Sequence, residues 1–202
     1  MLRIKLSFYL CPVQKTKVAI FASGTGSNAV NLIRHFSGHE QIDVTFVLSN
    51  KEDAKVLSSA RDLGVQTFYR SNDDVADAEV LKWLCKEADI QWIVLAGYLR
   101  KVPEAFIAAY GERIINLHPS LLPKFGGKGM YGSNVHKAVI ENGEKESGIT
   151  IHYVNEAFDE GRIIAQFHCW IDEGETVESL AAKIQWLEHS YLPIVIERTL
   201  MQ

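Results

Sequence analysis

The chain has 202 residues, of which 47% are apolar and 23% charged, and its formal net charge is −4. These proportions are those of an ordinary globular protein, and they exclude a disordered or collagen-like chain. The mild acidity excludes a broad nucleic-acid-binding surface but leaves room for a local phosphate pocket.

Residues 1–16 are expected to be an extension ahead of one domain over residues 17–202. Their apolar run is shorter than the roughly 7–15 residues of a signal-peptide core, so export is not expected. No run approaches the roughly 18 apolar residues that cross a membrane. Cys11, Cys85 and Cys169 are widely spaced and form no C-x-x-C pair. They favour a reducing, cytoplasmic compartment over a disulfide framework or a zinc ribbon.

The first half of the chain alternates short apolar runs with helical stripes. One such stripe is formed by Ala29, Leu32, Ile33 and Phe36, at i, i+3, i+4 and i+7. Strands are expected over residues 17–21, 44–48, 65–68, 92–96 and 113–117. Helices are expected from about 27 to 36, up to 63, from 73 through about 88, and from 103 to 110. This alternation predicts a parallel α/β sheet.

The pattern changes after residue 117. Residues 123–134 contain four glycines and predict a loop, and a short helix is expected over about 134–142. Residues 149–153 alternate apolar and polar side chains, which predicts a half-buried strand, and residues 162–171 predict another. A last helix is expected to begin at the N-cap Thr176, and Pro193 should kink or end it. The expected fold is α/β and Rossmann-like: a mostly parallel sheet with helices on both faces and an antiparallel addition toward the C-terminus.

A glycine-rich turn separates the first strand from the first helix. The segment Gly24-Thr-Gly26-Ser-Asn-Ala29 matches the pattern G-x-G-x-x-A, which presents backbone N–H groups at a helix N-terminus, where an anion binds well. A dinucleotide site would also need a carboxylate at the end of the second strand, where Asn50 stands. The turn therefore favours a single phosphate. The alternative is a turn whose small residues serve only tight strand–helix packing.

Asn116 and His118 end the fifth strand two residues apart, so they share one face. An amide donor beside a group that titrates near neutral pH suits addition to a carbonyl, since the amide can stabilise an oxyanion while the imidazole moves a proton. Asp159, in the turn over residues 155–161, would raise the pKa of His118 if it lay nearby. The alternatives are a histidine satisfied at a strand end and an aspartate that caps its own turn.

The remaining histidines are weaker candidates. His35 and His39 are four residues apart, but Gly38 between them indicates that the helix has ended. No H-E-x-x-H pattern occurs, so metal binding is not expected. His152 and His168 lie within strands and are expected to have surface or packing roles, whereas His189 could line a cleft.

Five segments, in this order, resemble the phosphoribosylglycinamide formyltransferase family of folate-dependent formyltransferases. The resemblance covers about residues 17–199. Its segments are Ala22-Ser-Gly-Thr-Gly-Ser-Asn28, Val47-Leu-Ser-Asn-Lys51, Leu95-Ala-Gly-Tyr-Leu-Arg100, Ile115-Asn-Leu-His-Pro-Ser-Leu-Leu-Pro-Lys124 and Asp159-Glu-Gly161. It implies formyl transfer from 10-formyltetrahydrofolate, a cosubstrate, to glycinamide ribonucleotide in purine biosynthesis, without a metal.

The resemblance also implies roles for individual residues. Asn116, His118 and Asp159 would form the catalytic group. The ribonucleotide phosphate would be held by Gly26, Ser27 and Asn28, and Glu188 would contact the ribonucleotide. The residues expected at the folate are Leu99, Arg100, Lys101, Val102, Asn116, Asn155, Phe158 and Asp159.

One segment departs from the family pattern, and several alternatives stay open. The loop over residues 125–134 is longer and richer in glycine than the family's shorter form, and we interpret it as a mobile flap beside the substrates. The near alternatives are formyltetrahydrofolate hydrolase or another folate-dependent formyltransferase. The distant ones are a dinucleotide-dependent oxidoreductase and a non-catalytic nucleotide-binding regulator. The expected partners are small molecules, with no nucleic acid or membrane, and the expected state is a monomer or homodimer.

Overall fold

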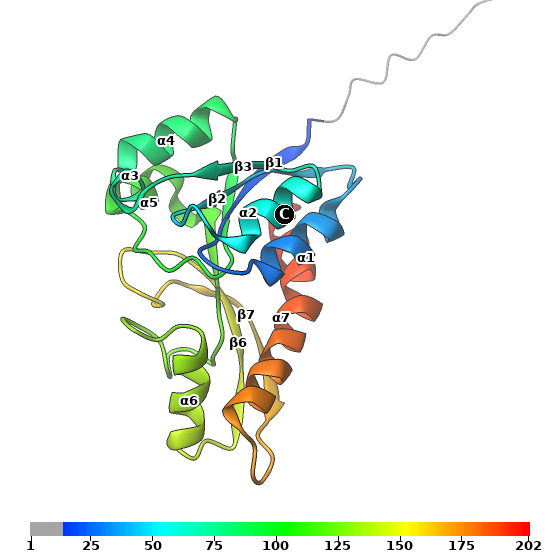
Figure 1. The fold of residues 1–202 in the computed structure, drawn as a ribbon, viewed down its shortest axis with the longest axis vertical. Helices are drawn as coiled ribbons and strands as arrows, with labels where there is room; N and C mark the ends of the chain where they lie inside the picture. Colours follow the sequence, from blue (N-terminus) through cyan, green and yellow to red (C-terminus); the bar gives the residue numbers. More distant parts are fainter. Residues whose placement is uncertain (1–13) are drawn as a thin grey trace, which may run out of the picture.

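The computed structural model describes residues 14–202, so the expectations for residues 1–13, Cys11 included, lie outside it. Seven strands form one sheet in the order β3-β2-β1-β4-β5-β6-β7. Figure 1 shows β6 and β7 beside the long C-terminal helix. Strands β1 to β5 pair in parallel, and β6 and β7 add antiparallel. The expected mostly parallel sheet with an antiparallel addition is thereby confirmed. The strands are β1 (Thr16–Phe21), β2 (Ile42–Ser49), β3 (Gln66–Tyr69), β4 (Trp92–Leu95), β5 (Ile114–His118), β6 (Glu146–Tyr153) and β7 (Ile163–Trp170).

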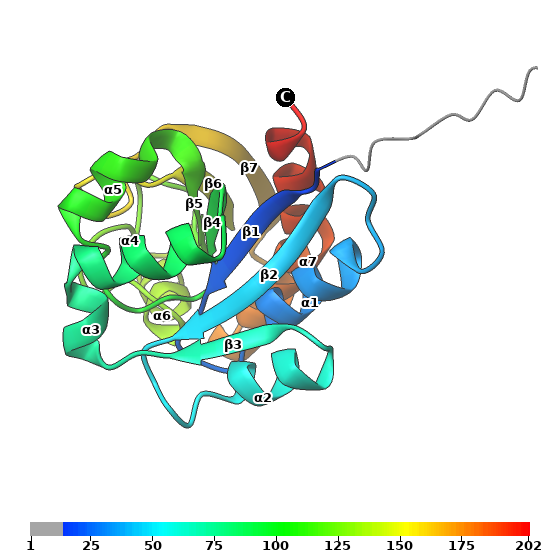
Figure 2. The same cartoon turned by 90° about the horizontal axis from the view of Figure 1, so that it is seen from above.

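Helices cover both faces of this sheet, and Figure 2 shows the two layers. Residues that alternate along β1 feed two cores: Val18 and Ile20 pack with α1, α2, α6 and α7, whereas Ala19 and Phe21 pack with α3, α4 and α5. The helices are α1 (Ser27–Phe36), α2 (Lys55–Asp62), α3 (Asn72–Ala76), α4 (Ala78–Glu87), α5 (Glu104–Tyr110), α6 (Ser133–Glu141) and α7 (Val177–Leu200), with a 3-10 turn, η1 (Gly111–Arg113). Within the described residues, no helix is both long and apolar enough to cross a membrane.

The single helix expected over residues 73–88 is wrong, because the chain breaks at Asp77 into α3 and α4. Asp77 is extended, and its carboxylate accepts a hydrogen bond from the backbone N–H of Glu79 at 2.8 Å. An aspartate satisfies the free N–H groups at a helix start better than it serves in a helix interior. Ser71 and Asp74 form a capping box at the start of α3 in the same way.

Strand β6 was expected to be half-buried, and this too is wrong, because its polar side chains are as buried as its apolar ones. Thr150 is 0% exposed and His152 2% exposed. The Thr150 hydroxyl donates to the Ser120 carbonyl at 2.7 Å and accepts from the Leu122 N–H at 3.0 Å. Since these bonds replace water, the alternating pattern did not mark a solvent-facing side.

Pro193 does not end α7, which continues to Leu200. A proline lacks the N–H that would bond the carbonyl four residues earlier, here that of His189. The side-chain amide of Asn31, in α1, donates to this carbonyl at 2.8 Å. A contact between two helices therefore replaces the hydrogen bond that the proline removes. The expected start of α7 is confirmed, because Thr176 forms a capping box with Ser179.

Replacing Asn31 by alanine should lower the free energy of unfolding by about 1 kcal/mol, because the His189 carbonyl then loses its donor. Urea denaturation measures this change. The matched background is Pro193→Ala, in which a backbone N–H at position 193 can reach the same carbonyl. In the Pro193→Ala background, Asn31→Ala should lower the free energy of unfolding by clearly less. Equal costs in the two backgrounds would contradict this account of how α7 continues through Pro193.

Candidate active site

A cavity of about 890 Å³ lies at the carboxyl ends of β1, β4 and β5. In an open parallel sheet this edge is where loops converge and ligands bind, at the point where the strand order reverses; here that point is between β1 and β4. All residues expected at the site line the cavity: Gly26, Ser27, Asn28, Leu99, Arg100, Lys101, Val102, Asn116, His118, Asn155, Phe158, Asp159 and Glu188.

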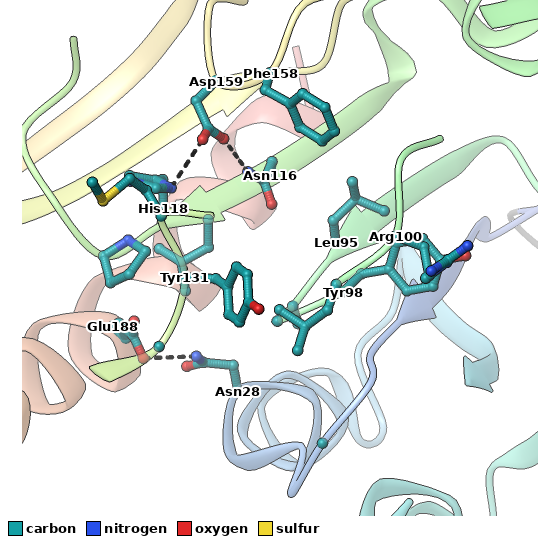
Figure 3. A pocket seen from close by; sticks show the side chains of 18 of the residues that line it. Asn28, Leu95, Tyr98, Arg100, Asn116, His118, Tyr131, Phe158, Asp159 and Glu188 are labelled. Atoms are coloured by element: carbon teal, nitrogen blue, oxygen red, sulfur yellow. Dashed lines mark hydrogen bonds and ion pairs between the residues drawn. The ribbon is translucent and has the colours of Figure 1, made fainter. Parts of the chain in front are cut away.

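The Asp159 carboxylate lies between Asn116 and His118 (Figure 3). Asn116 and His118 project from β5, whereas Asp159 comes from the connection between β6 and β7. The Asn116 side-chain amide donates to Asp159 Oδ1 at 3.3 Å, and His118 Nδ1 lies 3.5 Å from Asp159 Oδ2. The structure therefore brings together the three side chains that the sequence could only place separately.

The glycine-rich loop holds this group through its main chain. His118 Nε2 donates to the carbonyl of Phe125 at 2.8 Å, and the Gly127 N–H donates to Asp159 Oδ2 at 2.9 Å. Because a carbonyl only accepts, Nε2 of His118 must carry a proton. A Cβ at Gly126 would press on Leu122 and Asp159, so only glycine allows this approach. The start of the loop thus fixes the acid–base pair, while its mobility stays a prediction.

Burial and the nearby carboxylate act on the pKa of His118 in opposite directions. Removal of the ring from water lowers its pKa, and this effect outweighs the nearby Asp159 charge, which raises it. Asp159 therefore acts on the His118 pKa in the expected direction, and burial opposes it. Burial also raises the pKa of Asp159, yet contacts with His152, His118 and the Gly127 N–H bring that pKa below its usual value.

His152 is a site residue that the sequence analysis missed. Its Nδ1 donates to the Tyr153 carbonyl at 2.8 Å, so its Nε2 can accept from the Asn116 amide at 3.1 Å. His152 Nε2 also lies 3.7 Å from Asp159 Oδ1. The signal for this residue is the register of β5 against β6, in which Asn116 is paired with His152, and a single sequence does not reveal register.

The Asn116 amide group is therefore engaged with its neighbours. Its Nδ2 faces both Asp159 Oδ1 and His152 Nε2. The sequence analysis expected this group to donate to an oxyanion in the cavity. Such donation requires the amide to rotate away from at least one of these partners.

The other histidines take different places. His35 and His39 both contact Glu197, at 2.9 and 3.4 Å, and join the end of α1 to α7. His168 is exposed beside Glu146, as expected. His189 was expected to line a cleft, but it is absent from the cavity lining because α7 turns the preceding residue inward instead. His136, in the first turn of α6, lines the cavity with Nδ1 unpartnered, and the sequence analysis did not single it out.

The glycine turn and α7 meet at one end of the cavity. Gly26 has a positive φ of 74°, and a Cβ there would overlap the side chain of Val56, so the turn requires glycine. Helix α1 starts at the next residue without a side-chain cap, which leaves its first N–H groups to a ligand. The Asn28 amide donates to Glu188 Oε2 at 2.8 Å, and burial raises the pKa of Glu188.

The other end of the cavity has several apolar side chains beside the charged Arg100 and Lys101. Figure 3 shows Leu95, Tyr98 and Phe158 on the side away from Asn28 and Glu188. Leu99 is exposed and Val102 buried in the segment after β4. Tyr131, from the glycine-rich loop, extends into the space between the two ends. Across residues 14–202, no three His, Cys, Asp or Glu side chains are grouped so that they could hold a metal ion.

Comparison with known proteins finds a matching family and relatives that share one name. Residues 16–196 match the family described as formyl transferase. The chain is 36% identical to phosphoribosylglycinamide formyltransferase of Bacillus subtilis (strain 168), over 91% of this chain and 94% of the relative. It is 38% identical to the chloroplastic phosphoribosylglycinamide formyltransferase of Arabidopsis thaliana, over 90% of this chain. The chain spans only 65% of the Arabidopsis thaliana relative and 61% of the Vigna unguiculata one.

Solved structures agree with these relatives. The crystal structure of phosphoribosylglycinamide formyltransferase from Bacillus Halodurans matches with a TM-score of 0.82 at 36% identity, covering 91% of this chain and 95% of that one. The protein of the same name from Brucella melitensis matches with a TM-score of 0.83 at 34% identity, covering 92% and 96%.

Asp159→Asn should lower the pKa of His118 further, because the carboxylate opposes the effect of burial. An NMR titration of the carbon-bound imidazole protons measures this pKa in both proteins. Asp172→Asn, which removes an exposed carboxylate bonded to Lys183, is the control and should leave the His118 pKa unchanged. A rise in the His118 pKa on loss of Asp159 would refute this electrostatic account.

Proposed function

The chain belongs to the formyl transferase family, and on that basis we propose that it transfers a formyl group from 10-formyltetrahydrofolate to the amine of N1-(5-phospho-D-ribosyl)glycinamide. The products are the N-formyl ribonucleotide and tetrahydrofolate, and the reaction serves de novo purine (IMP) biosynthesis. The names of the relatives support this choice of acceptor, notably that of the Bacillus subtilis protein, which this chain matches over 94% of its length.

One observation supports the proposal: one cavity is lined by the glycine turn at the N-terminus of α1, by the segment after β4, and by Asn116, His118 and Asp159. A formyl transferase needs this arrangement, because two substrates must meet at one carbon atom.

We assign the glycine-turn end to the ribonucleotide. The N–H groups of Gly26, Ser27 and Asn28, at the positive end of the α1 dipole, would hold the phosphate. Glu188, positioned by Asn28, would accept hydrogen bonds from the ribonucleotide. This places the glycinamide chain toward His118.

We assign the end at the segment after β4 to the folate. The segment Leu99, Arg100, Lys101 and Val102 would hold the pterin together with the turn that contains Asn155, Phe158 and Asp159. Backbone groups of such loops can pair with the pterin edge, while Leu95 and Phe158 supply apolar contact. The formyl group would then face β5.

The chemistry follows from these positions. The substrate amine attacks the formyl carbon and forms a tetrahedral centre with an oxyanion. A developing negative charge beside His118 raises its pKa, as the Asp159 charge already does, so the imidazole can accept a proton as the reaction proceeds. His118 stabilises the oxyanion and takes up the proton that the attacking amine loses. The proton passes on to the folate nitrogen, and the carbon–nitrogen bond to the folate breaks as the formyl carbonyl re-forms. Asn116 would add a donor once its amide rotates.

The alternatives are less well supported. A formyltetrahydrofolate hydrolase would use water as the acceptor, and the glycine turn and Glu188 would then have no role in binding an acceptor. Another folate-dependent formyltransferase would need a different acceptor in the same place. We further propose a cytoplasmic monomer or homodimer that acts on small molecules without a metal, nucleic acid or membrane. Cys85 and Cys169 are free thiols, which suits a reducing compartment.

The direct test mixes the purified protein with 10-formyltetrahydrofolate and glycinamide ribonucleotide and follows tetrahydrofolate formation. We expect product only when both substrates are present. Equal product formation without the ribonucleotide would instead establish the hydrolase. No product under either condition would reject both.

His118→Ala should reduce turnover by roughly 10²-fold or more, because the site loses its acid–base group. His168→Ala is the matched control, since this histidine is exposed and contacts only Glu146 among the carboxylates described. Steady-state rates of both variants at saturating substrates provide the measurement. A near-normal rate for His118→Ala would remove this residue from the mechanism.

A further inference from the structure

A chain of polar side chains starts between the ends of β1 and β2, and its first two members are buried. The Leu99 N–H donates to the Ser23 hydroxyl oxygen at 2.8 Å, and the Ser23 hydroxyl donates to Asn50 Oδ1 at 2.6 Å. The Asn50 amide donates in turn to Asn72 Oδ1 at 2.9 Å. Ser23 is 1% exposed and Asn50 7% exposed, so water does not compete with the bond between them, whereas Asn72 at the outer end is exposed.

The Leu99 N–H can only donate, and the hydroxyl and amide groups are oriented to continue the chain from it. A serine hydroxyl has one proton, and here it goes to Asn50, which leaves a lone pair for the Leu99 N–H. The amide of Asn50 is oriented because its NH₂ group is bonded to Asn72 and its oxygen therefore faces Ser23. Together, the three side chains orient the Ser23 hydroxyl so that its oxygen accepts from the Leu99 N–H.

This support joins the two segments that we assign to different substrates. Ser23 directly precedes the glycine turn, and its own N–H donates to the carbonyl of Gly97 at 3.0 Å. Together with the bond from the Leu99 N–H, this makes a two-point attachment between the turn and the segment after β4. On its other side, the turn is attached to α2, because the Val56 N–H donates to the Gly24 carbonyl at 3.2 Å.

We propose that Ser23 and Asn50 are positioning residues that hold the glycine turn and the segment Leu99–Val102 in one fixed arrangement. Each substrate then strengthens the binding of the other. The proposal rests on the assignment of these two segments to the ribonucleotide and the folate. A phosphate that orders the turn also orders the Leu99 backbone through Ser23, and by linkage the folate must then favour the ribonucleotide equally.

The same network explains why an amide stands at position 50. A carboxylate here could accept from Ser23, but it could not donate to Asn72, and it would place a charge at a buried position. Asn50, whose uncharged side chain argued against a dinucleotide site, thus links Ser23 to Asn72 in this structure.

Isothermal calorimetry tests the coupling with the non-reacting pair of tetrahydrofolate and glycinamide ribonucleotide. In the unaltered protein, we expect saturating ribonucleotide to tighten tetrahydrofolate binding by about fivefold or more. In Ser23→Ala this factor should fall below about twofold, because the Leu99 N–H and Asn50 lose their common partner. In steady-state kinetics the KM for 10-formyltetrahydrofolate should rise by about tenfold with kcat changed much less, as for lost binding rather than lost chemistry.

Two further comparisons separate positioning from a general structural role. Ser49→Ala is the matched control, because Ser49 is also buried at a strand end but its hydroxyl serves only the N–H of Lys51. It should keep the full coupling. Asn72 is exposed and lies outside the cavity lining, so its variants should fold. Asn72→Asp keeps an acceptor for Asn50 and should retain coupling, whereas Asn72→Ala should reduce it.

Each outcome of these experiments either supports or overturns the proposed coupling. Full coupling in Ser23→Ala overturns the proposal, as does equal coupling in the two Asn72 variants. If Ser23→Ala does not fold, the Asn72 pair gives the answer alone. If the unaltered protein binds both ligands without coupling, only this inference fails; if it binds neither, the proposed function fails as well.

Discussion

The site depends on the contacts of the Asp159 carboxylate, which is partly buried. The Asn116 amide and the Gly127 N–H donate hydrogen bonds to it, and ring nitrogens of His118 and His152 lie 3.5 and 3.7 Å from its oxygens. These partners come from β5, β6 and the glycine-rich loop, so the carboxylate joins three segments that are distant in sequence. Its pKa stays low for the same reason, and the negative charge remains available to act on the imidazole.

The frame around this carboxylate comes from the sheet. Strand β1 sends alternate side chains into two cores, one on each face, and this fixes the strand ends relative to one another. Strand β6 adds buried polar side chains, of which Thr150 makes two bonds to the segment after β5. The loops at the carboxyl edge therefore start from rigid positions, and the cavity that they form is defined before any ligand binds.

Much of the fold and site could be predicted from local sequence patterns. The glycine turn and the Asn116–His118 pair depend on periods of a few residues, which sequence displays directly. The register that places His152 beside Asn116, the main-chain contacts of Phe125 and Gly127, and the depth of burial that lowers the His118 pKa all depend on distant parts of the chain. The break at Asp77 was missed for another reason: a capping residue interrupted an otherwise helical pattern.

The hold of the glycine-rich loop on the acid–base pair has an evolutionary consequence. Phe125 and Gly127 act through a carbonyl and an N–H, which every residue other than proline supplies. The path of the chain nevertheless restricts its composition. Gly126 has little room for a side chain beside Leu122 and Asp159, and Gly127, Gly129 and Gly132 have positive φ angles of 90°, 91° and 55°, which strain any other residue. Selection acting here would therefore register the exchange of one of these glycines as well as an inserted or deleted residue.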